Sequence, residues 1–280
     1  MIASAAVSKR ALSMFARVFP RCSMISQAIA FNLFLAFFPA LLIAVGVATS
    51  PVGVRTNLFD LISDLTTFLP PGSQQMVSEF LVKRGPDAWR WALLGLGGTL
   101  LAGTQVMKLL MEGIHIIYGD YERPGFFARQ LRALALLVLT VAPLLVAAIL
   151  GVFGRPLRRW AGAEFGIGPT VQAWWGVFFH GVAILLAMIA VTIIYRWARP
   201  RQHSLVAVLP GALIATLLWW VADIVFGFYV RKMPYGQLYG GLAAVIGLLI
   251  WMELSTVIIF LGASWNAELA ESRKGTRARG

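Results

Sequence analysis

A series of long apolar stretches constrains this chain more than any other feature. They cover residues 28–49, 91–118, 131–153, 172–196, 205–230 and 238–264. A helix of about 20 residues, rising about 1.5 Å per residue, crosses the hydrocarbon layer of a bilayer. Only helices and closed barrels satisfy their backbone in lipid, and these stretches lack the alternation of barrel strands. The sequence therefore predicts an all-α polytopic membrane protein with about six transmembrane helices.

The composition agrees with a membrane protein, since 59% of the residues are hydrophobic and only 13% are charged. Soluble domains are typically about a quarter charged. The net charge of +12 would suggest nucleic acid in a soluble protein, but basic loops at a membrane explain it more simply. We therefore expect no nucleic-acid partner. The single cysteine, Cys22, excludes an internal disulfide and a CxxC site.

The basic residues outside the apolar stretches predict the orientation. They are in excess on the side that holds both termini, so both termini are expected in the cytoplasm. Residues 1–27 form a basic amphipathic segment suited to a membrane surface, 28–264 the transmembrane domain, and 265–280 a basic cytoplasmic tail. A cleaved signal peptide is the competing interpretation of the N-terminus. The full helical length of the next apolar stretch favours a retained first span.

The predicted external loop, residues 50–90, is itself amphipathic. Leucine, isoleucine and phenylalanine recur at helical spacing over residues 58–69, and the sequence LPPGS then ends the pattern. Ser73 is a reasonable N-cap for a second short helix. We expect this loop to form an external cap, and no stretch between spans is long enough for a soluble domain.

Three sequence blocks resemble the YihY/BrkB family of six-helix bacterial membrane proteins. They are AIAFNLFLAFFPALLIAV in the first span, LPGALIATLLWW in the fifth, and YGQLYGGLAAVIGLLIWMELSTVIIFLGASWNAEL in the sixth. The chain departs from the family pattern at Asn32, Ala36 and His115, and just before Asn266. The resemblance implies a multi-pass fold in the bacterial inner membrane. It also brings an old ribonuclease label and suggestions of envelope-related transport.

Polar residues within the apolar stretches are the candidate functional residues, because ionisable groups in lipid usually face the bundle interior. In the second span they recur in steps of 3, 4 and 3 and so share one helix face. We expect Lys108 to pair with Glu253, with Glu112 as a local alternative. The groups could also serve only to lock helix packing. The candidate intramembrane polar pathway consists of Asn32, Gln105, Lys108, Glu112, His115, Asp223, Glu253 and Asn266.

Small residues predict where helices approach closely, since association in lipid depends on tight packing. Gly95 and Gly98 mark one such face, and Gly236 and Gly240 form a GxxxG step.

Catalytic motifs are not recognisable. The three histidines, His115, His180 and His203, are scattered, and the sequence contains no HxxxH metal motif, no GxxxxGK[ST] phosphate loop and no GxSxG elbow. We therefore expect no catalytic, cofactor or metal site and no enzymatic activity.

The leading functional hypothesis is a transporter or flippase-like protein for an anionic or amphipathic envelope molecule. It depends on the buried polar residues and on a basic cytoplasmic rim that attracts phosphate headgroups. The alternative is a non-transporting scaffold for envelope assembly. The expected partners are membrane lipids, with an anionic lipid or envelope precursor as substrate, and a homo-oligomer is left open.

Overall fold

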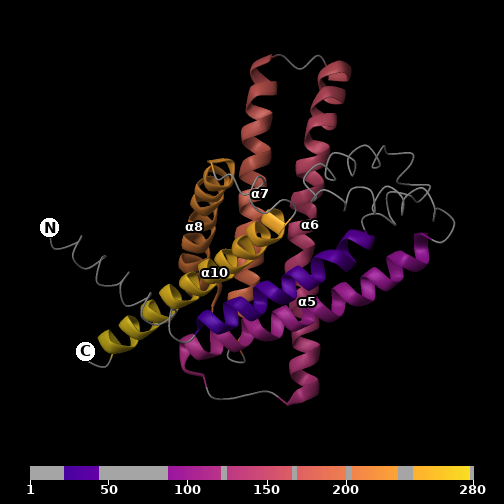
Figure 1. Ribbon diagram of the computed structural model, residues 1–280. Coiled ribbons are helices and arrows are strands. Elements are labelled where there is room, and N and C mark those ends of the chain that lie inside the picture. The colour runs from indigo at the N-terminus through magenta and orange to yellow at the C-terminus, as the bar shows by residue number, and fades with distance from the viewer. Residues whose placement is uncertain are drawn as a thin grey trace. The chain divides into compact units, whose positions relative to one another are not determined.

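The computed structural model describes residues 22–43, 88–120, 125–165, 169–199, 204–232 and 242–277, and these are helical except for a few residues at the helix ends. The helix Cys22–Ile43 comes first. It is followed by α5 (Ala88–Tyr118), α6 (Phe126–Phe165), α7 (Pro169–Trp197), α8 (Leu205–Lys232) and α10 (Leu242–Arg277) (Figure 1). No strand occurs in these ranges. The prediction of an all-α protein is therefore confirmed.

Five of the described helices contain a segment long and apolar enough to cross a membrane. These segments are Cys22–Ile43, Ala92–Tyr118, Phe126–Ala147, Leu205–Tyr229 and Val245–Ser272, and α7 adds a shorter apolar stretch, Gly181–Trp197. Several helices extend beyond the predicted spans. α6 begins at Phe126 and ends at Phe165, and α10 continues to Arg277, so residues 265–277 of the predicted tail are helical. An apolar stretch marks only the lipid-crossing part of a helix, which can continue into water.

Several predictions fall outside the described residues. They concern the N-terminal segment up to residue 21, the external loop from 44 to 87, and the glycine pair Gly236 and Gly240. These stay predictions.

The described residues divide into two compact units. Unit 1 contains those of Leu110–Trp220 and Val257–Gly280, together with Cys22 and Ser23. Unit 2 contains those of Met24–Leu109 and Val221–Thr256. The helices α5, α8 and α10 each contribute to both units.

In unit 1, α6 and α7 run antiparallel and pack side by side (Figure 1). The part of α8 in this unit shows how its helices are adapted to lipid. Ala212 and Ala215 are buried, whereas Leu209, Leu213 and Leu217 are exposed. Large apolar side chains thus lie on the outer face, and small ones allow close packing inside.

In unit 2, the helix Cys22–Ile43 packs closely on α5. A Cβ atom added at Gly95 would meet the Pro39 carbonyl oxygen at 2.5 Å, and one added at Gly98 would meet the Pro39 ring at 2.9 Å. The two glycines therefore lie where the two helices approach closely, and their small size allows this approach. Phe226 of α8 and Trp251 of α10 add a ring contact with centroids 5.2 Å apart.

Candidate functional site

The C-terminal end of α5 places the first charged group of the site. Gly119 has a φ of +69°, a conformation that glycine adopts without strain. The Asp120 N–H donates to the His115 carbonyl oxygen at 3.0 Å, and the Gly119 N–H donates to that of Ile116 at 3.3 Å. This pair of bonds is a Schellman motif, which ends the helix and satisfies its last carbonyls. It also fixes Asp120 just beyond the last turn.

Asp120 is bound by an arginine from the end of α7. Arg199 Nε donates to Asp120 Oδ2 at 2.5 Å, and its Nη2 donates to Oδ1 at 3.0 Å. The guanidinium also lies over the Tyr118 ring, with Cζ 3.8 Å from the centroid. Arginine suits this position because its planar guanidinium can bind a carboxylate at two points and also stack on an aromatic ring. These contacts join the ends of α5 and α7.

A second ion pair joins α5 to α6. Arg129 Nη2 donates to Glu112 Oε2 at 3.1 Å, with side-chain exposures of 36% and 22%. An arginine on the neighbouring helix thus reaches Glu112. The expected pairing of Lys108 with Glu253, or with Glu112, stays a prediction.

His115 lies among these charged groups and is itself buried. Its nearest electrostatic neighbours are Asp120, Glu112, Arg199 and the backbone of Ala198. The Nε2 atom is buried and has no hydrogen-bond partner among the residues that the structure describes. We call this group of side chains the charged junction: Glu112, His115, Tyr118, Asp120, Arg129 and Arg199.

A neutral polar contact joins α8 to α10 in the same unit. Asn266 Oδ1 accepts from the Gly211 N–H at 2.8 Å, and its Nδ2 donates to the Val208 carbonyl oxygen at 2.9 Å. Pro210 lies inside α8, where it lacks an N–H and disturbs the preceding turn. Asn266 thus satisfies backbone groups next to a proline, as buried helices in lipid require.

Tyr195 of α7 and Gly262 of α10 complete this second contact. The Tyr195 hydroxyl donates to the Ile259 carbonyl oxygen at 2.6 Å. A Cβ atom at Gly262 would collide with that hydroxyl and with the Gly211 carbonyl oxygen, so the helices touch at their backbones. We call this group the asparagine junction: Tyr195, Val208, Gly211, Ile259, Gly262 and Asn266.

The eight pathway candidates fall in both units. The structure brings Glu112 and His115 into the charged junction and places Asn266 in the asparagine junction. The other five belong to unit 2, where Asp223 is exposed and Gln105, Lys108 and Glu253 are half-buried. Asn32 Nδ2 donates to Ala28 in its own helix at 2.8 Å. A continuous pathway through all eight stays a prediction.

Sequence reasoning missed Asp120, Arg129, Arg199 and Tyr195. The first three lie at helix ends, where charges were interpreted as solvated loop residues. A signal existed for Tyr195, because a tyrosine in an apolar stretch needs a partner for its hydroxyl. In the described ranges, no group of three or more histidine, cysteine or acidic side chains could hold a metal ion.

Comparison with known proteins places the chain among bacterial membrane proteins. The family model described as Virulence factor BrkB matches residues 19–280. The ribonuclease-like protein YfkH of Bacillus subtilis (strain 168) is 28% identical over 252 residues, which are 89% of this chain and 90% of YfkH.

Two further relatives are named UPF0761 membrane protein. The one from Alkalilimnicola ehrlichii is 27% identical over 89% of this chain, and the one from Tolumonas auensis is 31% identical over 51%. The matches cover 55% and 47% of these relatives, so the chain spans about half their length. No solved structure matches. The extent of the family match, together with the apolar helices, shows that the chain belongs to the BrkB family of multi-pass membrane proteins.

Proposed function

We propose that this protein moves an anionic or amphipathic envelope molecule across the bacterial inner membrane, with both termini in the cytoplasm. The charged junction is the observation that supports this proposal. Two ion pairs and a buried imidazole lie at the ends of otherwise apolar helices. Ionisable groups in membrane helices are costly and often mark the route of a polar substrate.

The two ion pairs differ in a way that suits a transport step. The Arg199 side chain is only 9% exposed and is bound to its carboxylate at two points, whereas Arg129 is 36% exposed and donates to Glu112 through Nη2. An incoming phosphate or carboxylate can therefore compete for Arg129 more easily than for Arg199. In this mechanism Arg199 holds the helix ends together while Arg129 exchanges Glu112 for the substrate.

His115 supports the same interpretation. Among the described residues its buried Nε2 atom has no hydrogen-bond partner, which is costly unless another group fills that position for part of the time. A neutral imidazole accepts or donates one hydrogen bond at this nitrogen, according to its tautomer. A polar headgroup that passes the junction would supply the missing partner.

The proposal does not include hydrolysis. The ribonuclease-like name belongs to YfkH, and the groups of the charged junction are engaged in pairs that join helices. Purified protein should leave single-stranded RNA intact in the presence of Mg²⁺ or Mn²⁺. Cleavage that co-purifies with the protein and is lost in His115→Ala would contradict this part of the proposal.

Transport can be tested in proteoliposomes that contain a fluorescent phosphatidylglycerol. Dithionite added outside the vesicles quenches the fluorescence of probe in the outer leaflet only. Probe that moves from the inner to the outer leaflet is then quenched as well, so this movement appears as a further loss of fluorescence. We expect the wild type to accelerate it, and the double variant Glu112→Gln, Arg129→Gln to lose the acceleration while remaining folded. Equal rates in wild-type and protein-free vesicles, for this probe and for a labelled phosphatidylethanolamine, would contradict the proposal.

A scaffold for envelope assembly is the second candidate function. The observation in its favour is that the side-chain bonds described for both junctions join different helices, as packing alone would require. A scaffold predicts that the wild type does not accelerate exchange between leaflets and that the double variant loses stability. A transporter predicts that transport is lost at unchanged stability.

A further inference from the structure

Arg132 is a cation in unit 1 that the charged junction does not use. It lies on α6, three residues after Arg129 and therefore on nearly the same helix face. Its Nη1 atom is buried and has no hydrogen-bond partner in the described ranges. The two carboxylates of the charged junction are already bound by Arg129 and Arg199.

A buried guanidinium nitrogen without an acceptor is unfavourable, since it loses its bonds to water without replacement. The position of Arg132 indicates what could supply the acceptor. It lies seven residues into the apolar segment Phe126–Ala147, at a depth of about 10 Å for a helix rising about 1.5 Å per residue. From this depth the long side chain of an arginine extends toward the interface, where the phosphates of lipids lie.

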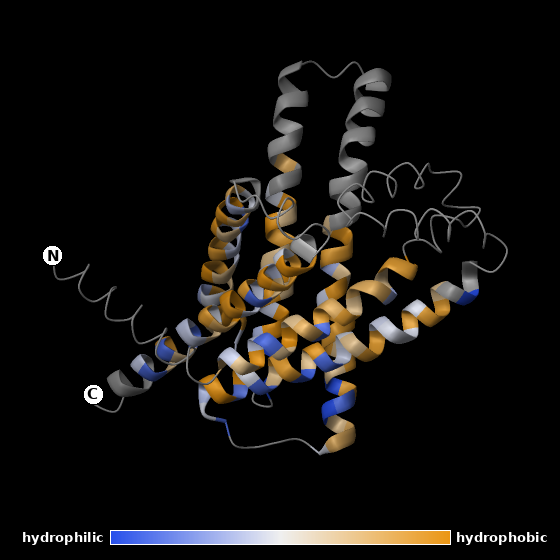
Figure 2. Ribbon diagram, in the orientation of Figure 1, coloured by the Kyte–Doolittle hydropathy of each residue, from blue (hydrophilic) through white to orange (hydrophobic). Residues whose placement is uncertain are grey.

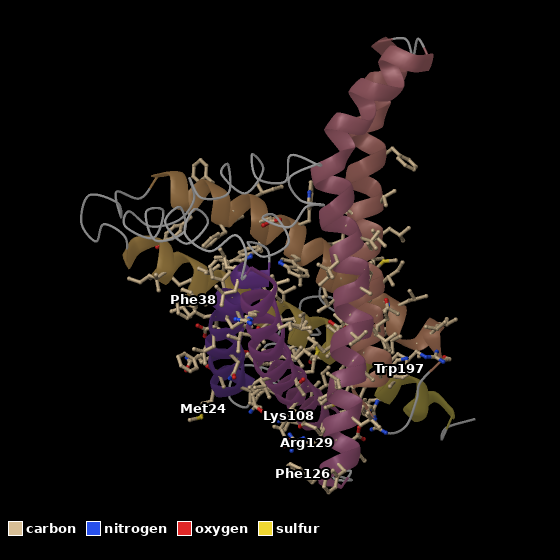
Figure 3. All side chains as sticks on the ribbon, turned by 90° about the vertical axis from the view of Figure 1, so that its right-hand side faces the viewer. Met24, Phe38, Lys108, Phe126, Arg129 and Trp197 are labelled. Carbon is tan, nitrogen blue, oxygen red and sulfur yellow. The ribbon has the colours of Figure 1, made fainter. Side chains whose placement is uncertain are left out.

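The exposed face of the first two turns of α6 is apolar. Phe126, Phe127 and Leu131 are strongly exposed, Phe127 by 85%. Figure 3 shows Phe126 and Arg129 at the same end of α6, and Figure 2 shows the hydrophilic band there between apolar residues. Exposed aromatic and aliphatic side chains beside arginines match the boundary between headgroups and acyl chains.

We propose that the first two turns of α6 bind an anionic phospholipid, with Arg132 donating to its phosphate. Arginine binds phosphate oxygens at two points and keeps its charge in an apolar setting. Phe126, Phe127 and Leu131 contact the glycerol and the upper acyl chains. Arg129 and Arg132 supply two positive charges to this end of α6, and Glu112, which binds Arg129, supplies one negative charge, so a headgroup with net negative charge binds better than a zwitterionic one. This inference goes beyond the proposed function, because the bound lipid need not be the molecule that is moved.

The test uses the full-length protein in nanodiscs of equimolar phosphatidylglycerol and phosphatidylcholine, with native mass spectrometry of the retained lipid. We expect the wild type to retain phosphatidylglycerol selectively and Arg132→Gln to reduce this selectivity about tenfold. Arg132→Lys should keep part of it. Arg196→Gln is the matched control, because Arg196 is a half-buried arginine at the end of α7, and it should leave the selectivity unchanged.

Four outcomes would overturn the proposal. They are equal retention of the two lipids by the wild type, unchanged selectivity in Arg132→Gln, an equal loss in Arg196→Gln, and displacement of the lipid by millimolar inorganic phosphate, which would indicate a small-anion site. If Arg132→Gln does not fold, Phe127→Ala serves in its place, since an exposed side chain contributes little to folding. Selective lipid retention without leaflet exchange would contradict only the transport proposal.

Discussion

The two junctions of unit 1 join helices by opposite means. The charged junction uses ion pairs between side chains at helix ends, and Arg129 and Glu112 remain partly exposed. The asparagine junction uses two neutral side chains, Asn266 and Tyr195, bonded to backbone groups, and the helices meet at glycines. Long side chains in partial contact with solvent can exchange partners, whereas a backbone contact through glycine cannot loosen without separating the helices. The comparison indicates that the asparagine junction is fixed and that the charged junction can open.

The largest effect is expected at the glycine contact. Gly262→Leu would drive a side chain into Tyr195 and the Gly211 carbonyl oxygen, at a cost of more than about 4 kcal/mol. We expect no monodisperse protein on size exclusion in detergent. Gly247→Leu is the matched control on α10, since a Cβ atom there meets nothing within 4 Å. Normal folding of Gly262→Leu would show that the contact is not fixed.

The next effect concerns Asn266. Asn266→Leu leaves the Gly211 N–H and the Val208 carbonyl oxygen without their partner, and the free energy of unfolding should fall by about 2–3 kcal/mol. Unfolding titrations in SDS measure this change. Asn32→Leu should change it by less than about 0.5 kcal/mol, because Asn32 bonds only within its own helix. An equal fall in the free energy of unfolding in both variants would show that Asn266 contributes no more to stability than Asn32 does.

Asp120 should matter less than Asn266. Asp120→Asn keeps the shape but weakens the two bonds from Arg199, and we expect a loss of about 1–2 kcal/mol. A double-mutant cycle with Arg199→Gln should show a favourable coupling of similar size. Additive losses would mean that the two residues do not act as a pair.

The smallest effect is expected at Glu112. Glu112→Gln removes a partly exposed ion pair and should lower stability by less than about 1 kcal/mol, with the difference shrinking at high salt. SDS titrations at two salt concentrations measure the loss of stability and its dependence on salt. A loss larger than that of Asp120→Asn would reverse the order that the comparison predicts.

The sequence predicted much of the fold and part of the site. Hydropathy located the membrane helices, because burial in lipid leaves long apolar stretches that a single sequence records. Glu112 and His115 stood out because they are polar residues in such a stretch, and Asn266 because it belongs to the block that resembles the family. Their partners could not be predicted, since Arg199 and Asp120 lie 79 positions apart and only the folded chain brings them together. The partner of Lys108 stays a prediction for the same reason, because charge and depth alone do not define which helices are neighbours.

Cysteine accessibility in a bilayer tests most directly whether the charged junction opens while the asparagine junction stays closed. The background is Cys22→Ser, since Cys22 is buried, and the probes are His115→Cys and Ser264→Cys, two buried positions of unit 1. We expect a membrane-impermeant thiol reagent to label His115→Cys, and added phosphatidylglycerol to slow that labelling, while Ser264→Cys stays protected. Equal protection of both positions, or faster labelling of Ser264→Cys, would contradict the account.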